Sequence, residues 1–432
     1  MQISNNISKI SWSLADKFTF VLYGIATIAV LSITNEIEFG IFILFNNLHN
    51  FILTIATLLG TQSILQFSAD ENEKTRINTF SIINQTVIAI LLVGLVFIFR
   101  ESIAEIMQQP HLITVAQSLP LLVLFSIPRY FSITIMYREL KIFQIFLTNL
   151  VYFGTMSGMI FYNIYCANFL SYIDIINITY IGSALSAVVS ILLTFKYWKF
   201  SFKGKTKYNE ILNFSTKFSI TGIITSLPKS LDVFVIQYFW GTGIVGLYAP
   251  AKTIFRFIED GMTTMNFILY SPIVKYSATN DKILINKTIS KSISFLVIGF
   301  GIITLLCWIC GDIIFAYFLP TKFIEAIPFL NMLMLVSIIL PFTLISITIN
   351  ASGKTGTVAK YILCSFPFWL ISYFIIGTFF NEHEILIAFP YFIFTFVFSC
   401  FLFNYARKNF DLKFSQVFRT ISDFYSLIKS KL

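Results

Sequence analysis

The chain has 432 residues, of which 56% are hydrophobic and only 12% are charged, and its mean hydropathy is +0.80. This composition is typical of a polytopic membrane protein and excludes an ordinary soluble globular domain. At about 20 residues per span, the chain can form about twelve transmembrane helices joined by short loops. We therefore expect an all-α integral membrane protein.

Apolar segments of span length follow one another along the whole chain. The first comes after a polar stretch, residues 1–17, and it is longer than the apolar core of a cleavable signal peptide. With twelve such segments, both termini lie on the same side of the membrane. The segments expected to cross it are 18–34, 40–62, 79–99, 113–135, 143–163, 173–195, 215–240, 244–271, 292–318, 327–349, 361–380 and 385–405.

The basic residues are distributed unequally between the two sides of the predicted membrane. Of the 30 Lys and Arg residues, 24 lie in the termini and in alternate loops, and only Arg100 and Lys322 lie on the opposite side. By the positive-inside rule, both termini are expected to be cytoplasmic. The net charge of +9 is thus mainly a signal of topology, so that no nucleic-acid partner is expected. Contact with anionic membrane lipids is a second explanation for part of this charge.

The longest basic connection, from Lys196 to Glu210, divides the chain almost evenly. We expect an N-terminal six-helix lobe (1–200), a basic cytoplasmic linker (201–214), a C-terminal six-helix lobe (215–405) and a basic amphipathic tail (406–432). Apolar residues of the tail recur at helical spacing between basic ones, which suggests a helix on the inner membrane surface. A solvated chain end is the alternative.

A short sequence repeat relates the two halves. Phe39-Gly40-Ile41 opens the second segment, and Val245-Gly246-Leu247 opens the eighth, 206 residues later. Leu119-Pro120 and Ile327-Pro328 begin the fourth and tenth segments in the same way. Parallel repeats of this kind predict two lobes related by a pseudo-twofold axis along the membrane normal, with the substrate site between them.

The stretch from Leu227 to Ser277 places ionisable residues inside two apolar segments. Each such residue near a helix centre costs about 2.5–3.5 kcal/mol to insert, so these side chains must face protein or water. In the eighth segment, Lys252, Arg256 and Glu259 share one helical face. The alternative is a structural role, in which acidic neighbours neutralise Arg256. The ionisable residues concerned are Lys229, Asp232, Lys252, Arg256, Glu259 and Asp260.

The first half carries uncharged polar residues at the matching positions. At an offset of 206, Lys252 corresponds to Asn46 and Arg256 to Asn50, with His49 beside them. We expect a cavity that is polar on one wall and positive on the other. His49 is either a proton-titrating group or a hydrogen-bonded packing residue.

Two further sites have alternative interpretations. Arg129 follows Pro128 near the cytoplasmic end of the fourth segment, where it either faces the cavity or extends to the interface. Lys229 precedes Asp232 by three residues, so the two can also neutralise each other. Neither choice is decided by the sequence.

Several functional classes find no support in the sequence. The three histidines, His49, His111 and His383, are too scattered to form a metal site with other ligands. There is no Gly-x-Ser-x-Gly motif and no aqueous carboxylate pair suited to hydrolysis. We therefore expect neither an enzyme nor a cofactor or metal. Because no globular domain is large enough for an ATPase, energy must come from a gradient, the membrane potential or the fate of the substrate.

The chain resembles the polysaccharide-export branch, the O-antigen-type flippases, of the multidrug/oligosaccharidyl-lipid/polysaccharide exporter superfamily. The resemblance rests on Asp232 followed by YFWGTGIVGLYAPA, residues 238–251, which is similar to the family element "lGpeevGlY..A". A weaker copy is NEIEFGIF, residues 35–42, followed by LLGTQSILQFSA, residues 58–69. Twelve spans in two halves match this MATE-like architecture over nearly the whole chain.

The resemblance implies transport of undecaprenyl-diphosphate-linked oligosaccharide from the inner to the outer leaflet of the bacterial cytoplasmic membrane. It also implies a cationic central cavity, with Arg256 at a position where relatives commonly carry a cation. Relatives often have an Arg near the end of the first span, where this chain has Ser32. Other partners implied are membrane lipids and the polymerase and chain-length regulator of the same pathway.

Combined with the charge pattern, the resemblance suggests a role for each site residue. Arg256 and Lys252 are expected to hold the diphosphate, and Asn46 and Asn50 to contact sugar. Lys229, Arg129 and His49 complete the expected substrate-binding set, and Glu259, Asp260 and Asp232 are candidates for substrate release or proton coupling.

Three rival functions remain open at this point. The first is a multidrug extruder of the same fold coupled to H⁺ or Na⁺, for which an acidic cavity is expected. The second is lipid II flipping, for which the resemblance implies about fourteen spans. The third is a non-transporting scaffold in a polysaccharide-assembly complex, which would tolerate loss of Arg256.

Overall fold

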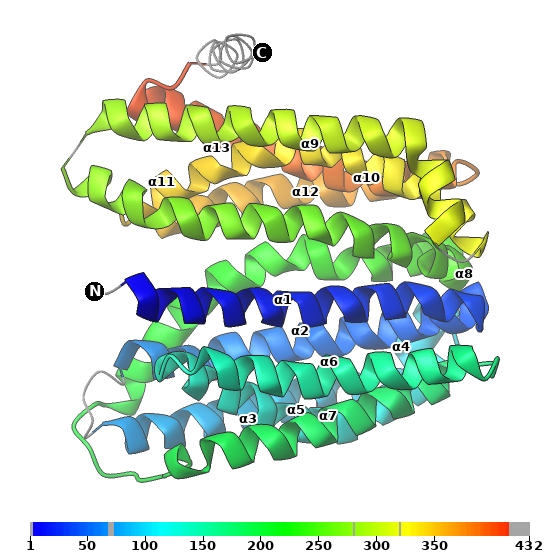
Figure 1. The fold of residues 1–432 in the computed structure, drawn as a ribbon, viewed down its shortest axis with the longest axis horizontal. Coiled ribbons are helices and arrows are strands. Elements are labelled where there is room, and N and C mark those ends of the chain that lie inside the picture. The colour runs from blue at the N-terminus through cyan, green and yellow to red at the C-terminus, as the bar shows by residue number, and fades with distance from the viewer. Residues whose placement is uncertain (1–2, 68–72, 280, 319–320, 414–432) are drawn as a thin grey trace. The chain divides into compact units, whose positions relative to one another are not determined.

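The computed structural model describes residues 3–67, 73–279, 281–318 and 321–413. It divides into two compact units, Met1–Gly246 and Leu247–Leu432, which are described separately (Figure 1). In the part of the chain described, every regular element is a helix. The N-terminal elements are α1 (Ile3–Ala29), η1 (Val30–Ser32), α2 (Glu36–Phe67), α3 (Lys74–Ile98), α4 (Arg100–Ile106), α5 (Leu112–Arg138), α6 (Ile142–Tyr165), α7 (Tyr172–Thr194) and η2 (Phe195–Tyr197). The remaining elements are α8 (Tyr208–Ala278), α9 (Lys282–Phe318), η3 (Thr321–Ala326), α10 (Ile327–Ile339), η4 (Leu340–Leu344), α11 (Ile345–Ala351), α12 (Thr355–Phe379), η5 (Glu384–Ala388) and α13 (Phe389–Phe410).

The long helix α8 contains the boundary between the two units. Its 71 residues would measure about 107 Å if straight, which is more than three times the hydrocarbon thickness. The helix is broken at Gly241, whose φ of 81° and ψ of 177° suit glycine because it has no Cβ. The break separates the expected seventh and eighth spans at the predicted glycine-rich turn.

The number of membrane spans agrees with the sequence prediction. Eleven helical segments of the described residues are long and apolar enough to cross a membrane. One of them, Gly222–Tyr270, has 49 residues and includes the break at Gly241, so it supplies two crossings. The prediction of an all-α membrane protein with about twelve spans is thus confirmed.

The N-terminal unit is a helical bundle in which each long helix has more than one neighbour. In the N-terminal unit (Figure 1), α1 lies along α6, α2 packs against α3 and α5, and α7 packs against α5 and α6. The first part of α8 also belongs to this unit. Near its end, Gln237 Nε2 donates to the Met107 carbonyl at 3.0 Å, and Gln109 Nε2 donates to Thr242 Oγ1 at 2.5 Å. This end of the seventh span is therefore attached to the α4–α5 connection.

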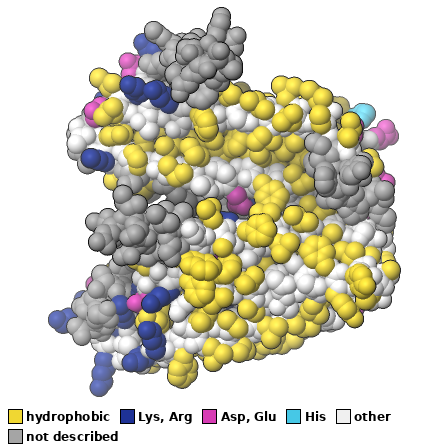
Figure 2. Space-filling view, viewed as in Figure 1, with side chains coloured by type: hydrophobic (Ala, Val, Ile, Leu, Met, Phe, Trp, Pro, Cys, Tyr) yellow, Lys and Arg dark blue, Asp and Glu magenta, His cyan; other side chains and the backbone are white. Residues whose placement is uncertain are grey.

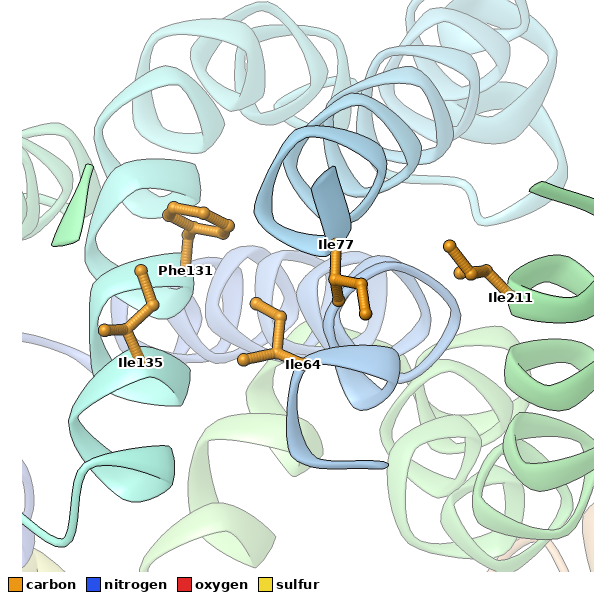
Figure 3. Close-up of a cluster of buried hydrophobic side chains, with 5 residues drawn as sticks. All are labelled: Ile64, Ile77, Phe131, Ile135 and Ile211. Carbon is orange, nitrogen blue, oxygen red and sulfur yellow. The ribbon is translucent and has the colours of Figure 1, made fainter. Parts of the chain in front are cut away.

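The other end of that span is attached by apolar packing. Ile211, from the start of α8, belongs to a fully buried cluster with residues of α2, α3 and α5 (Figure 3). The other members are Ile64, Ile77, Phe131 and Ile135. Because both ends are held by the first six spans, the seventh span groups with them in packing. The predicted division into repeat halves around residues 201–214 stays a prediction.

In the C-terminal unit, α12 packs against α13, and α10 packs against α9 and α13. The segment expected as one helix at 327–349 is instead α10, η4 and α11. Pro341 lies in the first turn of η4, and proline removes a backbone donor and clashes with the preceding turn of an α-helix. The expected tenth span is nevertheless present, because Ile324–Ala351 forms one candidate membrane span that contains this 3-10 turn.

Two further sequence expectations concern positions rather than elements. Pro120 lies inside α5, which starts at Leu112, so Leu119-Pro120 does not begin the fourth helix as expected. Of the predicted tail, residues up to Lys413 are described, and α13 ends at Phe410. The amphipathic helix expected in the rest of the tail lies outside the described residues.

The surface of the bundle suits a lipid environment. Many large apolar side chains on the outside of the helices are exposed, among them Leu91 and Leu124. Figure 2 shows hydrophobic side chains over most of the visible helix faces, and Lys and Arg gathered at the left end of the N-terminal unit. That separation of apolar faces from a charged end is expected of membrane-spanning helices.

Candidate functional site

Arg129 is buried inside the N-terminal bundle, with only 5% of its surface exposed. Its Nε donates to Ser186 Oγ at 3.0 Å, and its Nη2 donates to Asn149 Oδ1 at 2.6 Å. The guanidinium also lies 4.2 Å from the ring centre of Tyr152 and 5.1 Å from that of Tyr130. The side chain therefore does not extend to the interface but joins α5 to α6 and α7.

A carboxylate completes this network. Asn149 Nδ2 donates to Asp16 Oδ1 at 2.8 Å, so that the amide of Asn149 bridges the Asp16 carboxylate and the Arg129 guanidinium. Such charge-assisted hydrogen bonds are stronger than neutral ones. Asp16 was missed by the sequence analysis because residues 1–17 were treated as a polar N-terminal stretch. The signal in the sequence was the position of the acidic Asp16, immediately before the first expected span, 18–34.

His49 is also a buried residue of the N-terminal unit, with 1% of its surface exposed. Its Nε2 lies 3.0 Å from Ser126 Oγ on α5, and its ring stacks on Phe45 with centres 6.3 Å apart. Its Nδ1 is buried without a hydrogen-bond partner. His49, on α2, thus packs against α5, which is the helix that carries Arg129.

Asn46 and Asn50 have a different environment from His49. Asn50 is exposed and Asn46 is half-buried, and Asn50 Nδ2 donates to Asn46 Oδ1 at 3.0 Å. The polar residues of α2 are therefore divided: the two amides lie together on an accessible surface, and the imidazole points into the bundle. The amides have further capacity to donate and accept.

Lys229 and Asp232 both belong to the N-terminal unit, in the first part of α8. Lys229 is exposed, whereas Asp232 is only 3% exposed. One oxygen of the Asp232 carboxylate accepts the Val233 backbone N–H at 2.7 Å. Lys229 is therefore accessible to a ligand, whereas Asp232 is buried inside the N-terminal unit.

In the C-terminal unit, the second part of α8 has one packed face and one accessible face. Ala251, Phe255 and Ile258 are buried at helical spacing. Arg256 is exposed and Lys252 is half-buried, one helical turn apart on the other face. Their role in binding, which was expected from the sequence, stays a prediction.

Glu259 connects α8 to α13 within the C-terminal unit. Its Oε1 accepts a hydrogen bond from Tyr391 Oη at 2.5 Å, and the Tyr391 ring meets Phe255 edge-to-face with centres 6.0 Å apart. Asp260 is half-buried. Tyr391 was missed because it lies 132 residues from Glu259, and neither its spacing nor its surroundings in sequence connect the two.

The polar groups described so far differ in charge and in accessibility. No cluster of three or more His, Cys, Asp or Glu residues suited to a metal ion occurs in the described part of the chain. Of the site residues expected from the sequence, the exposed or half-buried ones are Lys229, Asn46 and Asn50 in the N-terminal unit, and Lys252, Arg256, Glu259 and Asp260 in the C-terminal unit. Arg and Lys bind phosphate oxygens through charge-assisted hydrogen bonds, and Arg can do so in bidentate geometry.

The sequence profile of a protein family described as polysaccharide biosynthesis protein matches residues 33–328. This match covers more than half of the chain. The chain belongs to this family. Among curated proteins, no sequence matches the chain.

Several solved transporter structures share the fold of this chain. An inward-facing multidrug resistance MATE family transporter of the MOP superfamily aligns with a TM-score of 0.78 and 12% identity, over 91% of this chain and 94% of the other. The lipid II flippase MurJ, in an inward closed conformation, aligns with a TM-score of 0.73 and 14% identity, over 98% and 93%. A MOP superfamily transporter from Pyrococcus furiosus, described by the reverse polarity of its binding pocket, aligns at 0.54 and 12%, over 94% and 93%.

This member of the polysaccharide biosynthesis family therefore has a MATE-like fold, as the sequence predicted. Its family and fold together support a multi-pass membrane transporter or flippase. At identities of 12–14%, the structural likeness defines the fold and leaves the transported molecule to the chemistry of the site.

Proposed function

We propose that this protein is a flippase for undecaprenyl-diphosphate-linked oligosaccharide repeat units of the O-antigen or capsule type. It moves them from the inner to the outer leaflet of the bacterial cytoplasmic membrane by alternating access. Membership of a polysaccharide biosynthesis family supports the sugar part of the proposal. The shared fold of a lipid II flippase supports the lipid-linked part.

The observation that carries the proposal is the position of Arg256 and Lys252. Both lie in a segment apolar enough to cross a membrane, on the accessible side of a helix whose other side is buried. Charged residues within a membrane-spanning segment are costly and usually mark a substrate pathway. A diphosphate is an anion that both cations can bind by charge-assisted hydrogen bonds, while its polyprenyl chain remains in the lipid.

The remaining residues take roles that follow from their environment. The accessible amides of Asn46 and Asn50 contact sugar hydroxyls, and Lys229 adds a positive group. Arg129 and His49, both buried, support the N-terminal unit from within instead of contacting the substrate directly. This changes the role given to these two residues from the sequence.

The acidic residues are proposed to couple or release the substrate. Glu259 accepts a hydrogen bond from Tyr391, so a change in the protonation of Glu259 alters the contact between α8 and α13. Asp260 and Asp232 are the other members of this proposed set.

Both termini are proposed to be cytoplasmic. The polymerase and the chain-length regulator of the pathway are proposed as partners.

The test uses a strain that lacks this gene, complemented with the wild type, Arg256→Ala or Arg256→Lys. Surface polysaccharide, the leaflet distribution of undecaprenyl-linked oligosaccharide and drug susceptibility are measured in the same cells. We expect the wild type to restore surface polysaccharide, Arg256→Ala to leave lipid-linked sugar in the inner leaflet, and Arg256→Lys to restore transport in part.

Lys360→Ala is the matched control, because Lys360 is an exposed cation of the same unit that has no proposed role. All variants are compared at equal amounts of protein in the membrane. Normal surface polysaccharide with increased drug sensitivity in the deletion strain would show an extruder instead. Full rescue by Arg256→Ala would indicate a scaffold that does not transport.

A further inference from the structure

The connection between α7 and α8 is a folded element, which we call the basic strap (residues 195–207). Its sequence, FKYWKFSFKGKTK, contains five lysines and five aromatic residues but no Asp or Glu. Its charge pattern predicted a basic linker over residues 201–214. In the structure, side chains of α3 and of the residue before it hold the strap along most of its length.

The acidic residue Glu73 holds the C-terminal part of the strap. Its carboxylate accepts the backbone N–H of Lys205 at 2.6 Å and that of Thr206 at 3.1 Å. Arg76 donates from Nε to the Thr206 carbonyl at 2.9 Å and from Nη1 to the Phe202 carbonyl. Gly204 allows this close approach, because a Cβ there would lie 2.5 Å from Arg76 Cδ.

The N-terminal part of the strap is held in the same way. Asn78 Nδ2 donates to the Tyr197 carbonyl at 3.0 Å. Thr79 Oγ1 accepts the Ser201 N–H at 2.8 Å and donates to the Ser201 carbonyl at 3.1 Å. Trp198 Nε1 lies within hydrogen-bond distance of Ser132 Oγ on α5. The strap is therefore fixed through its backbone and its indole ring.

Because the backbone makes these contacts, the lysine side chains are left on the outside. All five are exposed: Lys196, Lys199, Lys203, Lys205 and Lys207. Three phenylalanines between them are exposed as well, at 73% for Phe195, 47% for Phe200 and 66% for Phe202. Exposed apolar groups that gather in one segment, rather than being scattered singly, mark an interaction surface.

The place of the strap in the chain identifies the partner. The span Tyr172–Tyr197 ends in the strap, and the seventh span follows it. The strap therefore lies where the hydrocarbon region meets the headgroups, a zone in which aromatic side chains are enriched. Clustered lysines beside a membrane span are attracted to anionic lipids by about 1 kcal/mol each, which is about a fivefold effect per residue.

From these observations we infer that the basic strap is a binding surface for the headgroups of anionic phospholipids in the adjoining leaflet. The lysines bind the phosphate groups, and the exposed phenylalanines enter the interface beside them. Holding the strap against α3 arranges these side chains in advance, so less conformational entropy is lost on binding. The inference does not depend on which molecule the protein transports.

The test compares two variants of the full-length protein that lose four positive charges each. The strap variant combines Lys199→Gln, Lys203→Gln, Lys205→Gln and Lys207→Gln, which keep the backbone donors in place. The control variant combines Lys282→Gln, Lys287→Gln, Lys291→Gln and Lys360→Gln, all at exposed lysines of the C-terminal unit. Both are reconstituted in nanodiscs of phosphatidylcholine with about one-third phosphatidylglycerol, and the lipids that remain bound after extraction are counted by native mass spectrometry.

We expect phosphatidylglycerol to be enriched on the wild type and on the control variant, and the enrichment to fall at least threefold on the strap variant. The difference should shrink at high salt, because ions screen these charges. Equal enrichment on the wild type and the strap variant would overturn the inference. An equal fall in both variants would also overturn it, because the strap would then act only through net charge.

Two further measurements test whether docking of the strap matters for lipid binding and which anionic lipid the strap binds. Glu73→Gln keeps all five lysines but weakens the docking, so enrichment should fall in part; unchanged enrichment would contradict the role of docking. In nanodiscs without anionic lipid, undecaprenyl diphosphate is added as a probe. If the strap lysines are needed for that probe but not for phosphatidylglycerol, the surface serves the transported lipid, and the inference is wrong.

Discussion

Gly40 and Gly246 pack reciprocally in the N-terminal unit. A Cβ on Gly40 would lie 2.1 Å from the Thr242 carbonyl oxygen, and a Cβ on Gly246 would lie 2.1 Å from the Glu36 carbonyl oxygen. The two glycines are 206 residues apart, and so are Glu36 and Thr242. When each residue is replaced by its counterpart in the other repeat, the contact between Gly40 and Thr242 becomes the contact between Gly246 and Glu36. A local twofold axis requires this exchange. This relationship supports the repeat that was predicted from the sequence.

Substituting either glycine should destabilise the protein. In Gly40→Ala or Gly246→Ala, the new methyl group must displace backbone, which costs about 1–3 kcal/mol. We expect a lower melting temperature of the purified protein in detergent. Gly243→Ala is the control, because nothing lies within 4 Å of a Cβ there. A similar loss in the control would show that the close packing of Gly40 and Gly246 is not the cause.

Removing one member of the Asp16–Asn149–Arg129 network should destabilise the N-terminal unit. Arg129→Ala leaves the Asn149 and Ser186 oxygens without their buried donor, at a cost of about 1–3 kcal/mol. Arg129→Lys cannot make both contacts and should be intermediate. Thermal melting of Arg129→Ala, Asp16→Ala and the double variant measures the coupling between the two sites. Strictly additive losses would show that Asn149 does not couple them.

The docking of the strap should depend on pH through Glu73. Hydrogen bonds from the Lys205 and Thr206 N–H groups lower the pKa of Glu73 from its ordinary value of 4.5. A lowered folded-state pKa means that the stabilisation is complete above about pH 4.5 and is lost as the pH falls through the folded-state value. Hydrogen exchange of the Lys205 and Thr206 amides, corrected for intrinsic rates, should accelerate over that acidic range. In Glu73→Gln, exchange should be faster at neutral pH and should lose this pH dependence.

The hydrogen bond between Glu259 and Tyr391 should stabilise the C-terminal unit. Tyr391→Phe keeps the edge-to-face contact with Phe255 but removes the hydroxyl donor, so we expect a loss of about 1 kcal/mol. A thermal double-mutant cycle with Glu259→Gln measures the interaction. Tyr373→Phe is the control, because Tyr373 is also a buried tyrosine of this unit and lies outside the proposed site. No coupling between Tyr391 and Glu259 would contradict the structural role assigned to this contact.

The sequence predicted the membrane helices well because hydropathy is a local property. The break at Gly241 was expected from the glycine-rich turn, and Pro341 was visible as a possible interruption but was not used. By contrast, the strap depends on contacts such as that between Glu73 and Thr206, which are 133 residues apart. Charge composition alone predicted a basic linker and gave no indication that it would be docked.

The candidate site was predictable only in part, for a similar reason. Helical spacing identified Lys252 and Arg256 as neighbours on one face, and both are accessible. The repeat offset matched Asn46 and Asn50 to these cations and placed His49 only beside them in sequence; His49 is buried against Ser126. For Arg129, the choice between cavity and interface omitted a third possibility, because its partners on α6 and α7 could not be identified from one sequence.

The attachment of the seventh span to the first six has a consequence for expressing the protein as two separate polypeptides. A cut within the strap would leave the span without the partners that hold Ile211 and Thr242. A cut after Gly246, at the boundary of the compact units, would give each fragment its own core. Co-expressed fragments divided at the second position should therefore accumulate better than fragments divided at the first.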